Sequence, residues 1–213
     1  APEVMSKIVG NWAKELKFFY FKEFNIDNIP VLIARSGWSG EAGYEIYLLD
    51  GGKGNELWKI IMNAGEDYKI APAAPSQINR IECGMLSYGS DMTLEENPYD
   101  ISLGKFVHLE KNADFLSKEA LTKIKLNGIT RELVGVEINQ KTSDEFIRDH
   151  LPIYDDSNIV GKITSSVYSP RLKKNIGLAI INNNSKESEN LHLLYDDRKI
   201  EVRISKLPFI RNK

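Results

Sequence analysis

Apolar residues follow a helical period in some parts of the chain and alternate with polar residues in others. Near the beginning, Val4, Ile8, Trp12 and Leu16 lie four residues apart, which predicts an amphipathic helix over residues 3–15. Apolar positions recur every three or four residues in three later segments as well, and we expect helices at residues 56–64, 76–85 and 117–128.

Runs of aromatic and β-branched residues predict strands between these helices. The continuous aromatic run at residues 18–21 predicts a strand that is covered on both faces. Residues 31–34 and 44–48 predict two further strands, which are joined by a connection at residues 35–43 that is punctuated by glycines. The first half of the chain therefore mixes helices and strands.

The pattern changes after about residue 130, where short strands with turn residues between them replace the helices. The expected strands are residues 133–138, 159–167, 176–181, 191–195 and 200–204. Asp, Asn and Ser cluster in the connections at residues 155–158, 182–185 and 196–198. This spacing predicts an α+β chain with two parts, a mixed α/β region at residues 1–128 and a small antiparallel β-barrel or sandwich at residues 129–213.

Composition and charge exclude several classes of protein. The chain has 213 residues, of which 42% are hydrophobic, and a formal net charge of -2 without a block of like charges, so we expect no nucleic-acid partner. Its apolar runs are shorter than the roughly 20 residues of a membrane span, and we expect no membrane partner. The single cysteine, Cys83, has no internal partner, which favours a reducing, cytoplasmic location.

Local chemistry offers few catalytic candidates. The three histidines, His108, His150 and His192, are far apart and lack the spacing of metal ligands, so we expect no metal site. Cys83 lies in a predicted helix, where a packed thiol is the favoured interpretation. Phosphate-binding loops of the Rossmann or P-loop type are not found in the sequence.

One connection invites two interpretations. Trp38 stands between Gly37 and Gly40, and the acidic residues Glu41 and Glu45 follow it. It could be a tight hairpin whose glycines supply positive φ and whose tryptophan folds back on the core. The other interpretation is the rim of a ligand site, in which an aromatic face stacks on a flat heterocycle and a carboxylate accepts hydrogen bonds from the ring N–H groups.

A family resemblance favours the second interpretation. Residues 33–46, IARSGWSGEAGYEI, resemble the R-[ST]-G-[YW]-[ST]-G-E-x-G-[FY]-E-[IV] motif of the glycine-cleavage T-protein (aminomethyltransferase) family. Four further blocks are similar to that family in the same order, at residues 80–91, 97–99, 165–177 and 205–209. Within the family, the wording of these blocks resembles the dimethylsulfoniopropionate demethylase branch most.

The resemblance implies a folate site and its residues. In this family the pterin ring of tetrahydrofolate lies in a channel between domains, and the matched motif implies that Glu45 holds its edge. Trp38 and Tyr44 would form the aromatic wall, Glu41 would be a second candidate acceptor, and Tyr168 would be a channel residue. Arg80 is expected to be structural, paired with Glu82, Asp91 or another acid.

The implied function is tetrahydrofolate-dependent transfer of a methyl or aminomethyl group from a small-molecule donor. The family's N-terminal section, which carries its key aspartate, has no counterpart here, so the catalytic residue is unknown and the chain alone is expected to be inactive. Two alternatives stay open. One is a glycine-cleavage aminomethyltransferase with a lipoyl carrier protein as partner, and the other is a folate-binding module without catalysis.

Overall fold

The structure is a computed structural model that describes residues 1–139 and 150–211. The chain divides into two compact units, Ala1–Ser76 and Gln77–Lys213. The first unit contains α1 (Pro2–Val9), α2 (Trp12–Glu15), β1 (Phe21–Ile26), β2 (Ile29–Ala34), β3 (Glu45–Leu48) and α3 (Gly54–Gly65). The second contains α4 (Gln77–Glu82), α5 (Lys118–Asn127), β4 (Arg131–Ile138), β5 (Pro152–Asp155), β6 (Asn158–Ser169), β7 (Lys174–Asn182), β8 (Leu191–Tyr195) and β9 (Arg198–Ser205).

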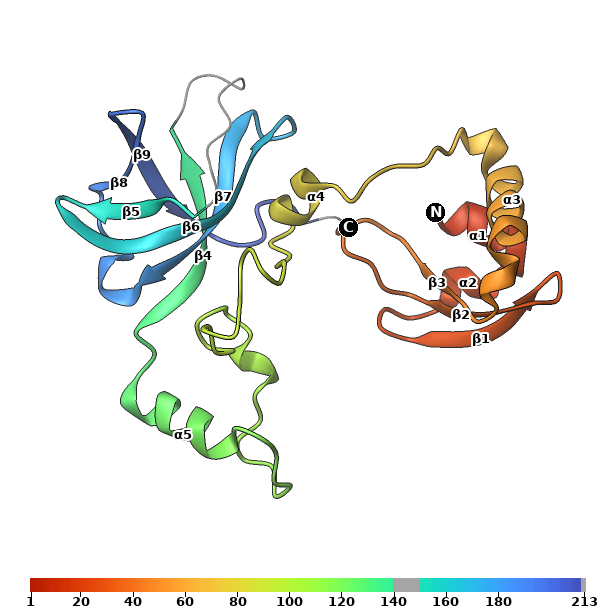
Figure 1. Cartoon of the computed structure of the whole chain (residues 1–213), viewed down its shortest axis with the longest axis horizontal. Coiled ribbons are helices and arrows are strands. Elements are labelled where there is room, and N and C mark those ends of the chain that lie inside the picture. Colours follow the sequence, from red (N-terminus) through yellow and green to blue (C-terminus); the bar gives the residue numbers. More distant parts are fainter. Residues whose placement is uncertain (140–149, 212–213) are drawn as a thin grey trace. The chain divides into compact units, whose positions relative to one another are not determined.

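The first unit, the sheet unit, is a three-stranded antiparallel sheet in the order β1-β2-β3. Figure 1 shows α1, α2 and α3 on the same side of this sheet. The central strand explains why, because Ile29, Val31 and Ile33 alternate with less buried residues and bury their side chains among the helices. One face of the sheet is therefore covered by helices and the other is left open.

Two predictions for this unit are wrong in detail. The expected helix over residues 3–15 is two helices, because Gly10 adopts φ +90° and ends α1 at Val9. The aromatic run at residues 18–21 is not covered on both faces, since its four side chains are all more than half exposed. Only Phe21 lies in a strand, and Phe19 has φ +66° in the turn that precedes it.

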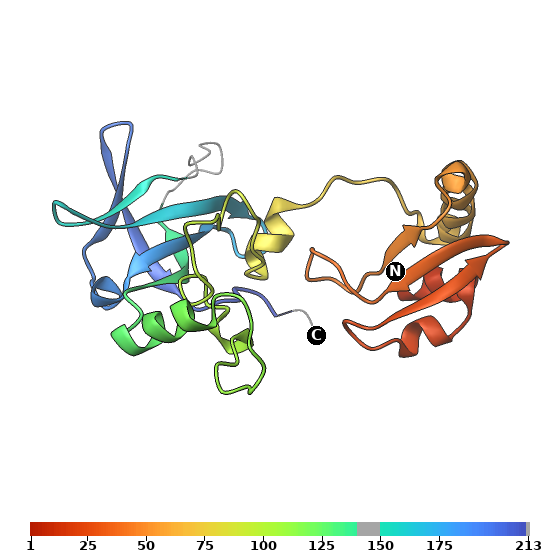
Figure 2. The ribbon, with the colours of Figure 1, turned by 60° about the horizontal axis from the view of Figure 1, so that its bottom comes forward.

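The second unit, the barrel unit, contains a closed antiparallel barrel in the order β4-β7-β6-β5-β8-β9 (Figures 1 and 2). This confirms the predicted barrel and the α+β fold class. The sequence analysis missed β5, which is only four residues long and opens with Pro152. The expected turns fall where Asp156, Asp196 and Asp197 adopt positive φ between paired strands.

The barrel strands bury apolar side chains on both faces. Inside the barrel, alternate residues such as Ile163, Ala179 and Leu193 form one cluster. On the outer surface, Ile176 and Leu178 pack against Ile81 of α4 and Ile101 of the segment that follows α4. The inward and outward clusters together explain why the middle of β7 is buried without interruption.

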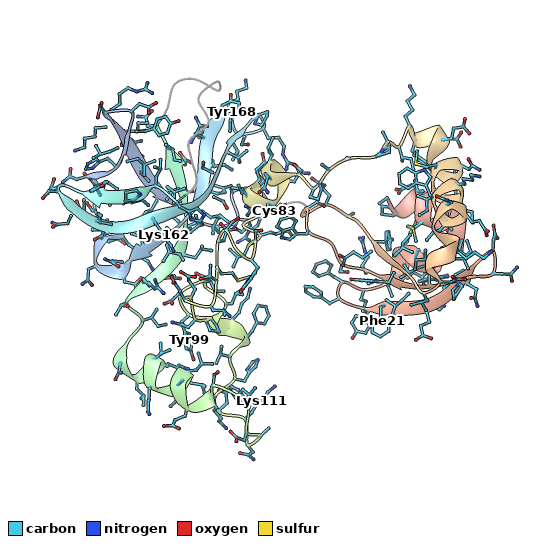
Figure 3. The ribbon with its side chains drawn as sticks, viewed as in Figure 1. Phe21, Cys83, Tyr99, Lys111, Lys162 and Tyr168 are labelled. Atoms are coloured by element: carbon cyan, nitrogen blue, oxygen red, sulfur yellow. The ribbon has the colours of Figure 1, made fainter. Side chains whose placement is uncertain are left out.

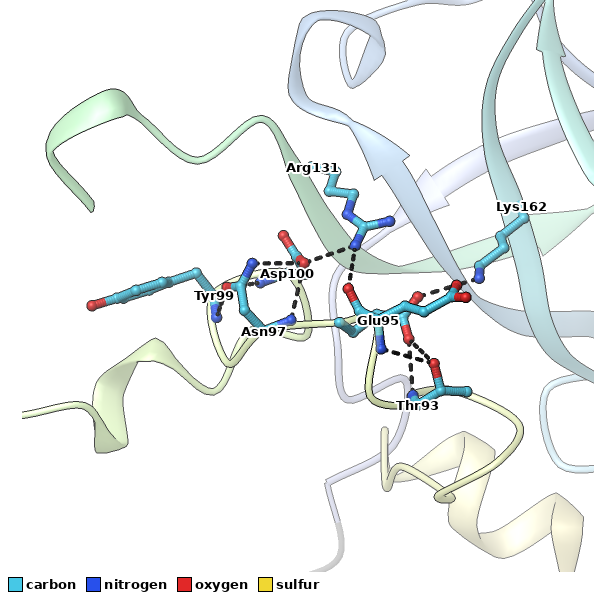
Figure 4. A network of polar contacts seen from close by, with 8 residues as sticks. Thr93, Glu95, Asn97, Tyr99, Asp100, Arg131 and Lys162 are labelled. Atoms are coloured by element: carbon cyan, nitrogen blue, oxygen red, sulfur yellow. Dashed lines mark hydrogen bonds and ion pairs between the residues drawn. The ribbon is translucent and has the colours of Figure 1, made fainter. Parts of the chain in front are cut away.

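The segment between α4 and β4 is largely irregular and is tied to the barrel by ion pairs (Figure 4). Asp100 accepts a bond from Arg131 at 2.9 Å, and Glu96 accepts one from Lys162 at 3.3 Å. Because this segment packs with the barrel, the compact units divide at Ser76. The predicted boundary at residue 128, which rests on the change of sequence pattern, stays a prediction.

Candidate functional site

Glu45 lies on the open face of the sheet unit. It is the first residue of β3, where Ile46 and Leu48 turn toward the helices and Glu45 and Tyr47 turn away. The register places Glu45 beside Ala34 of β2, and Ala34 beside Phe21 of β1. Glu45 therefore stands at the end of a row that crosses the uncovered face of the sheet.

The carboxylate of Glu45 is held by one hydroxyl group. The Ser36 hydroxyl donates a short hydrogen bond to Glu45 Oε2, and among the described residues Oε1 accepts no hydrogen bond. One oxygen is thus oriented by the protein while the other remains available for an external donor. Charge-assisted hydrogen bonds to such an oxygen are roughly twice as strong as neutral ones.

The connection between β2 and β3 is shaped by Arg35, whose Nη1 donates to the Gly43 carbonyl at 2.6 Å. Gly40 has φ +69°, a left-handed conformation that glycine adopts without steric cost. The backbone N–H of Glu41 donates to Ser39 Oγ at 3.3 Å, and Trp38 is 40% exposed. The predicted rim residues Trp38 and Glu41 therefore share one loop with the residues that lead into Glu45.

The Tyr44 side chain lies on the helix side of the sheet, opposite the side chain of Glu45. Its hydroxyl donates to the Ala13 carbonyl at 2.8 Å, and its ring packs with the helix-side cluster. The Arg35 guanidinium lies over this ring, 4.7 Å from its centroid. Burial raises the pKa of Tyr44, and the charge of Arg35 opposes that rise. Tyr44 thus anchors the start of β3 on the covered side of the sheet, and its place in an aromatic wall stays a prediction.

Tyr168, the remaining predicted site residue, belongs to β6 of the barrel unit (Figure 3). Its neighbour across the strand pair is Asn175 of β7. Because Tyr168 and Glu45 lie in different compact units, the expected common channel stays a prediction.

Arg80 is structural, as expected. It is 2% exposed, and its guanidinium donates to Asp91 Oδ2 at 2.8 Å and to Ser165 Oγ at 2.7 Å. Asp91 also accepts bonds from the hydroxyls of Ser165 and Thr164, each at 2.7 Å, and from the Ser87 N–H at 2.8 Å. This buried cluster joins the end of α4 to β6 of the barrel.

Glu82 forms a second buried link between the same two regions. Its carboxylate accepts bonds from the Ser169 hydroxyl at 2.5 Å and from Arg171 Nε at 2.7 Å. Two sequence blocks that carry the family resemblance, residues 80–91 and 165–177, therefore meet around buried acids. These contacts fix α4 and the segment after it to the barrel.

Two searches of the described residues bear on other kinds of site. Within residues 1–139 and 150–211, no three His, Cys, Asp or Glu side chains group as they would around a metal ion. None of the helices in the same ranges is long and apolar enough to cross a membrane.

Two family models match the chain. Residues 1–111 match the family model of the GCVT N-terminal domain, and residues 131–210 match that of the glycine cleavage T-protein C-terminal barrel domain. The chain belongs to the glycine cleavage T-protein family. The resemblance drawn from the five sequence blocks is thereby confirmed, and the closed six-stranded barrel is the family's C-terminal domain.

The relatives of this chain are named for different activities. The chain is 32% identical over 181 residues to the dimethylsulfoniopropionate demethylase DmdA of Ruegeria pomeroyi. It is 35% identical over 184 residues to an aminomethyltransferase of Bacillus cytotoxicus. Each match covers 85% of this chain and 49% of the relative, so the chain spans about half the length of the curated relatives it matches.

A solved structure has the same fold. The aminomethyltransferase T of the glycine cleavage system from Bartonella henselae matches with a TM-score of 0.75 over 93% of this chain and 54% of its own, at 24% sequence identity. At that identity the match establishes the fold of the T-protein family and leaves the reaction to be argued from the site.

The sequence analysis missed two features of the site. Ser36 was not recognised as the donor that holds Glu45, and Phe21 was not recognised as its neighbour in the cross-strand row. The place of Phe21 could have been predicted from the alternation of side chains along the strands. A register that pairs Ala34 with Glu45 fixes which residues share the open face. The hydroxyl contact depends on the path of the loop and had no signal in the residue pattern.

Proposed function

We propose that this chain is the C-terminal portion of a tetrahydrofolate-dependent one-carbon transferase, and that Glu45 holds the edge of the pterin ring. The observation that carries the proposal is a carboxylate on an uncovered sheet face with one oxygen fixed by Ser36 and the other available. Family membership supports folate-dependent one-carbon transfer as the general activity.

The residues present fit a pterin. The ring is flat and carries adjacent N–H donors on its 2-amino-pyrimidinone edge, and a carboxylate can accept two such bonds. Ser36 would keep the Glu45 carboxylate in one orientation before the ligand arrives, which reduces the conformational entropy lost on binding. The indole of Trp38, which is partly exposed on the same loop, would stack on the ring face.

The other predicted residues have smaller parts in this proposal. Glu41 would order the loop or serve as a second acceptor, and Tyr44 would hold the beginning of β3 through its bond to Ala13. Tyr168 would line the channel from the barrel. When bound, tetrahydrofolate would supply the nitrogen that receives the one-carbon group, while Glu45 and the loop position the ring.

The methyl or aminomethyl donor distinguishes the two versions of the proposal. We favour a dimethylsulfoniopropionate-demethylase-like transferase in the cytoplasm, with a small-molecule methyl donor, on the wording of the sequence blocks. The alternative is a glycine-cleavage aminomethyltransferase, which would take its group from a lipoyl carrier protein. It is supported by relatives with that name at 35% and 36% identity.

Titration of 5-formyl-tetrahydrofolate by calorimetry tests the Glu45 assignment. We expect Glu45→Gln to weaken binding by about tenfold, because it replaces charge-assisted hydrogen bonds with neutral ones and adds a donor. Glu23→Gln is the matched control, since Glu23 lies on the same open face, in the next row across from Leu32. It should leave the affinity within about twofold.

Two results would contradict the assignment. Equal affinity of the wild type and Glu45→Gln would remove Glu45 from the pterin site. Failure of the wild-type chain to bind folate at millimolar concentration would show that these residues do not form a folate site by themselves.

A further inference from the structure

The barrel unit has a hollow of about 270 Å³ where β4 ends and β7 begins. The strand register places Ile138 of β4 beside Asn175 of β7, and Glu137 of β4 beside Arg203 of β9. All four residues line the hollow. Pockets for drug-sized ligands measure roughly 300–1,000 Å³, so a hollow of this size suits a small molecule or an ion.

Positive charge predominates along the wall of the hollow. Lys173, Lys174 and Arg203 contribute three cations, and Glu137 is the one acid among the lining residues. Lys174 Nζ lies 2.7 Å from Glu137 Oε2, and Arg203 Nε lies 2.6 Å from Oε1 of the neighbouring Glu201. Lys173 forms no ion pair with any described residue, so its ammonium group is available to an external anion.

Asn175 adds a buried amide with an unused donor. Its side chain is 6% exposed, and its Nδ2 group has no hydrogen-bond partner among the described residues. Its cross-strand neighbour Ile138 belongs to the cluster inside the barrel, and residues paired in this way point to the same face, so the amide lies at the end of that apolar interior. Buried polar groups normally have partners, and an external acceptor would satisfy this one.

The chemistry of these groups selects an oxyanion. An ammonium group and an amide nitrogen only donate hydrogen bonds, and a guanidinium has further N–H groups besides the Nε that Arg203 directs to Glu201. A ligand with several acceptor oxygens on one centre can accept from all three side chains. A phosphate monoester carries about -1.5 to -2 charges at pH 7, which is closer to the excess of cations around the hollow than the single charge of a carboxylate.

We propose that this hollow binds a phosphate group, either as inorganic phosphate or as part of a small phosphate monoester. Lys173 supplies the unpaired positive charge, Asn175 donates from the end of the barrel interior, and Arg203 donates from β9. The ion pair between Lys174 and Glu137 holds the rim of the hollow. The proposal goes beyond folate-dependent transfer and does not depend on it, because the hollow is lined by barrel residues and Glu45 lies in the sheet unit.

Titration of the full 213-residue chain with inorganic phosphate and with glycerol 3-phosphate tests the proposal. Phosphorus NMR measures the affinity at constant ionic strength in chloride, so that screening by salt is the same throughout. We expect saturable binding, and Lys173→Met should weaken it by about tenfold because it removes a charge-assisted hydrogen bond. Lys199→Met, an equal change of charge at an exposed position of β9 outside the hollow, is the matched control and should change the affinity less than about twofold.

Asn175→Leu separates a binding role from a structural one. We expect it to weaken phosphate binding by about tenfold, while the urea midpoint in chloride stays the same or rises, because an apolar side chain replaces an unsatisfied amide. Added phosphate should raise the urea midpoint of the wild type more than that of Asn175→Leu. If Asn175→Leu does not fold, the exposed Lys173→Met variant decides the question alone.

Several results would overturn the proposal. These are the absence of saturable phosphate binding, equal effects of Lys173→Met and Lys199→Met, or wild-type affinity in a folded Asn175→Leu variant. Succinate that binds more tightly than both phosphate ligands would assign the hollow to a dicarboxylate and would also contradict it. If both phosphate ligands bind, the tighter one identifies the source of the phosphate group, as the free ion or as an ester. Loss of folate binding in Glu45→Gln would leave each of these results unchanged.

Discussion

The two units differ in how much of their apolar strand surface is covered. In the barrel unit, the middle of β7 is buried on both faces, by the barrel interior on one side and by the segment after α4 on the other. In the sheet unit, β2 alternates between fully buried and half-buried positions, because helices cover one face only. Both are antiparallel structures, so the difference lies in what covers them.

Closure explains this difference. A closed barrel satisfies every strand through a neighbour and leaves no edge, so it can bury its core without another domain. An open three-stranded sheet needs cover on each apolar face, and α1, α2 and α3 supply only one. The barrel unit therefore buries both faces of its central strand within itself, whereas the sheet unit leaves one face uncovered among the described residues.

The largest effect should follow from removing the buried acid that ties the irregular segment to the barrel. Asp91→Ala leaves the Arg80 guanidinium buried without its ion-pair partner and removes acceptors from Thr164 and Ser165. We expect the free energy of unfolding of the barrel unit to fall by about 3–5 kcal/mol. Urea unfolding followed by hydrogen exchange of β6 and β7 peptides measures it.

The control for that variant breaks an exposed ion pair in the same unit. Glu119→Ala removes the partner of Lys123 on α5, where the two groups lie 2.7 Å apart and both are largely exposed. Its cost should stay below about 0.5 kcal/mol. Comparable losses from both variants would mean that the Arg80 cluster contributes no more to stability than an exposed ion pair does.

Truncating one leucine in each unit compares the covered and open faces directly. Leu178→Ala on β7 removes a fully buried side chain on the outer barrel surface and should cost about 3 kcal/mol. Leu32→Ala on the open face of β2 should cost about 1 kcal/mol or less, because its side chain is only partly buried. Equal costs would show that the open face is already covered in the chain alone.

Tryptophan fluorescence can distinguish the effects of Leu32→Ala and Leu178→Ala. Trp12, Trp38 and Trp58 are the three tryptophans, and all lie before Ser76. Tryptophan fluorescence therefore follows unfolding of the sheet unit, while hydrogen exchange of β7 follows the barrel unit. Leu32→Ala should appear in the first signal and Leu178→Ala in the second.

The two units also differ in how much of their structure the sequence predicts. All barrel strands except β5 were found, because polar turns such as residues 155–158 and 196–198 separate their apolar runs. The family motif also singles out Glu45, whose role in folate binding stays a prediction. These features depend on local residue order, which a sequence displays directly.

The missed features depend on contacts between distant segments. The aromatic run at residues 18–21 has the pattern of a strand covered on both faces, yet nothing in the described structure covers it. A run of aromatic residues indicates an apolar segment, but it does not indicate whether other parts of the protein cover that segment. Likewise, no spacing rule predicts that Asp91 would meet Thr164 across more than 70 residues.

A small effect is expected at Glu96, whose side chain is 1% exposed and pairs with Lys162 at 3.3 Å. Burial by itself would raise the pKa of Glu96, but hydrogen bonds from Thr93 and the pairing with Lys162 outweigh it and lower the pKa below its ordinary value. A carboxylate with a lowered folded-state pKa stabilises the fold above its unfolded pKa of about 4.3, and that stability is lost as the pH falls through the folded pKa.

Glu96→Gln should therefore lower the free energy of unfolding by about 1 kcal/mol at neutral pH, and the difference from wild type should shrink as the medium becomes acidic. Unfolding curves at pH 7, 5 and 3.5 measure this trend. Glu95→Gln, at the exposed neighbouring position, should differ little from wild type at each pH. If the difference in free energy of unfolding between Glu96→Gln and wild type is the same at every pH, the amide destabilises the fold through its packing and not through the lost charge. The link between the irregular segment and the barrel would then rest on packing and on the Arg80 cluster alone.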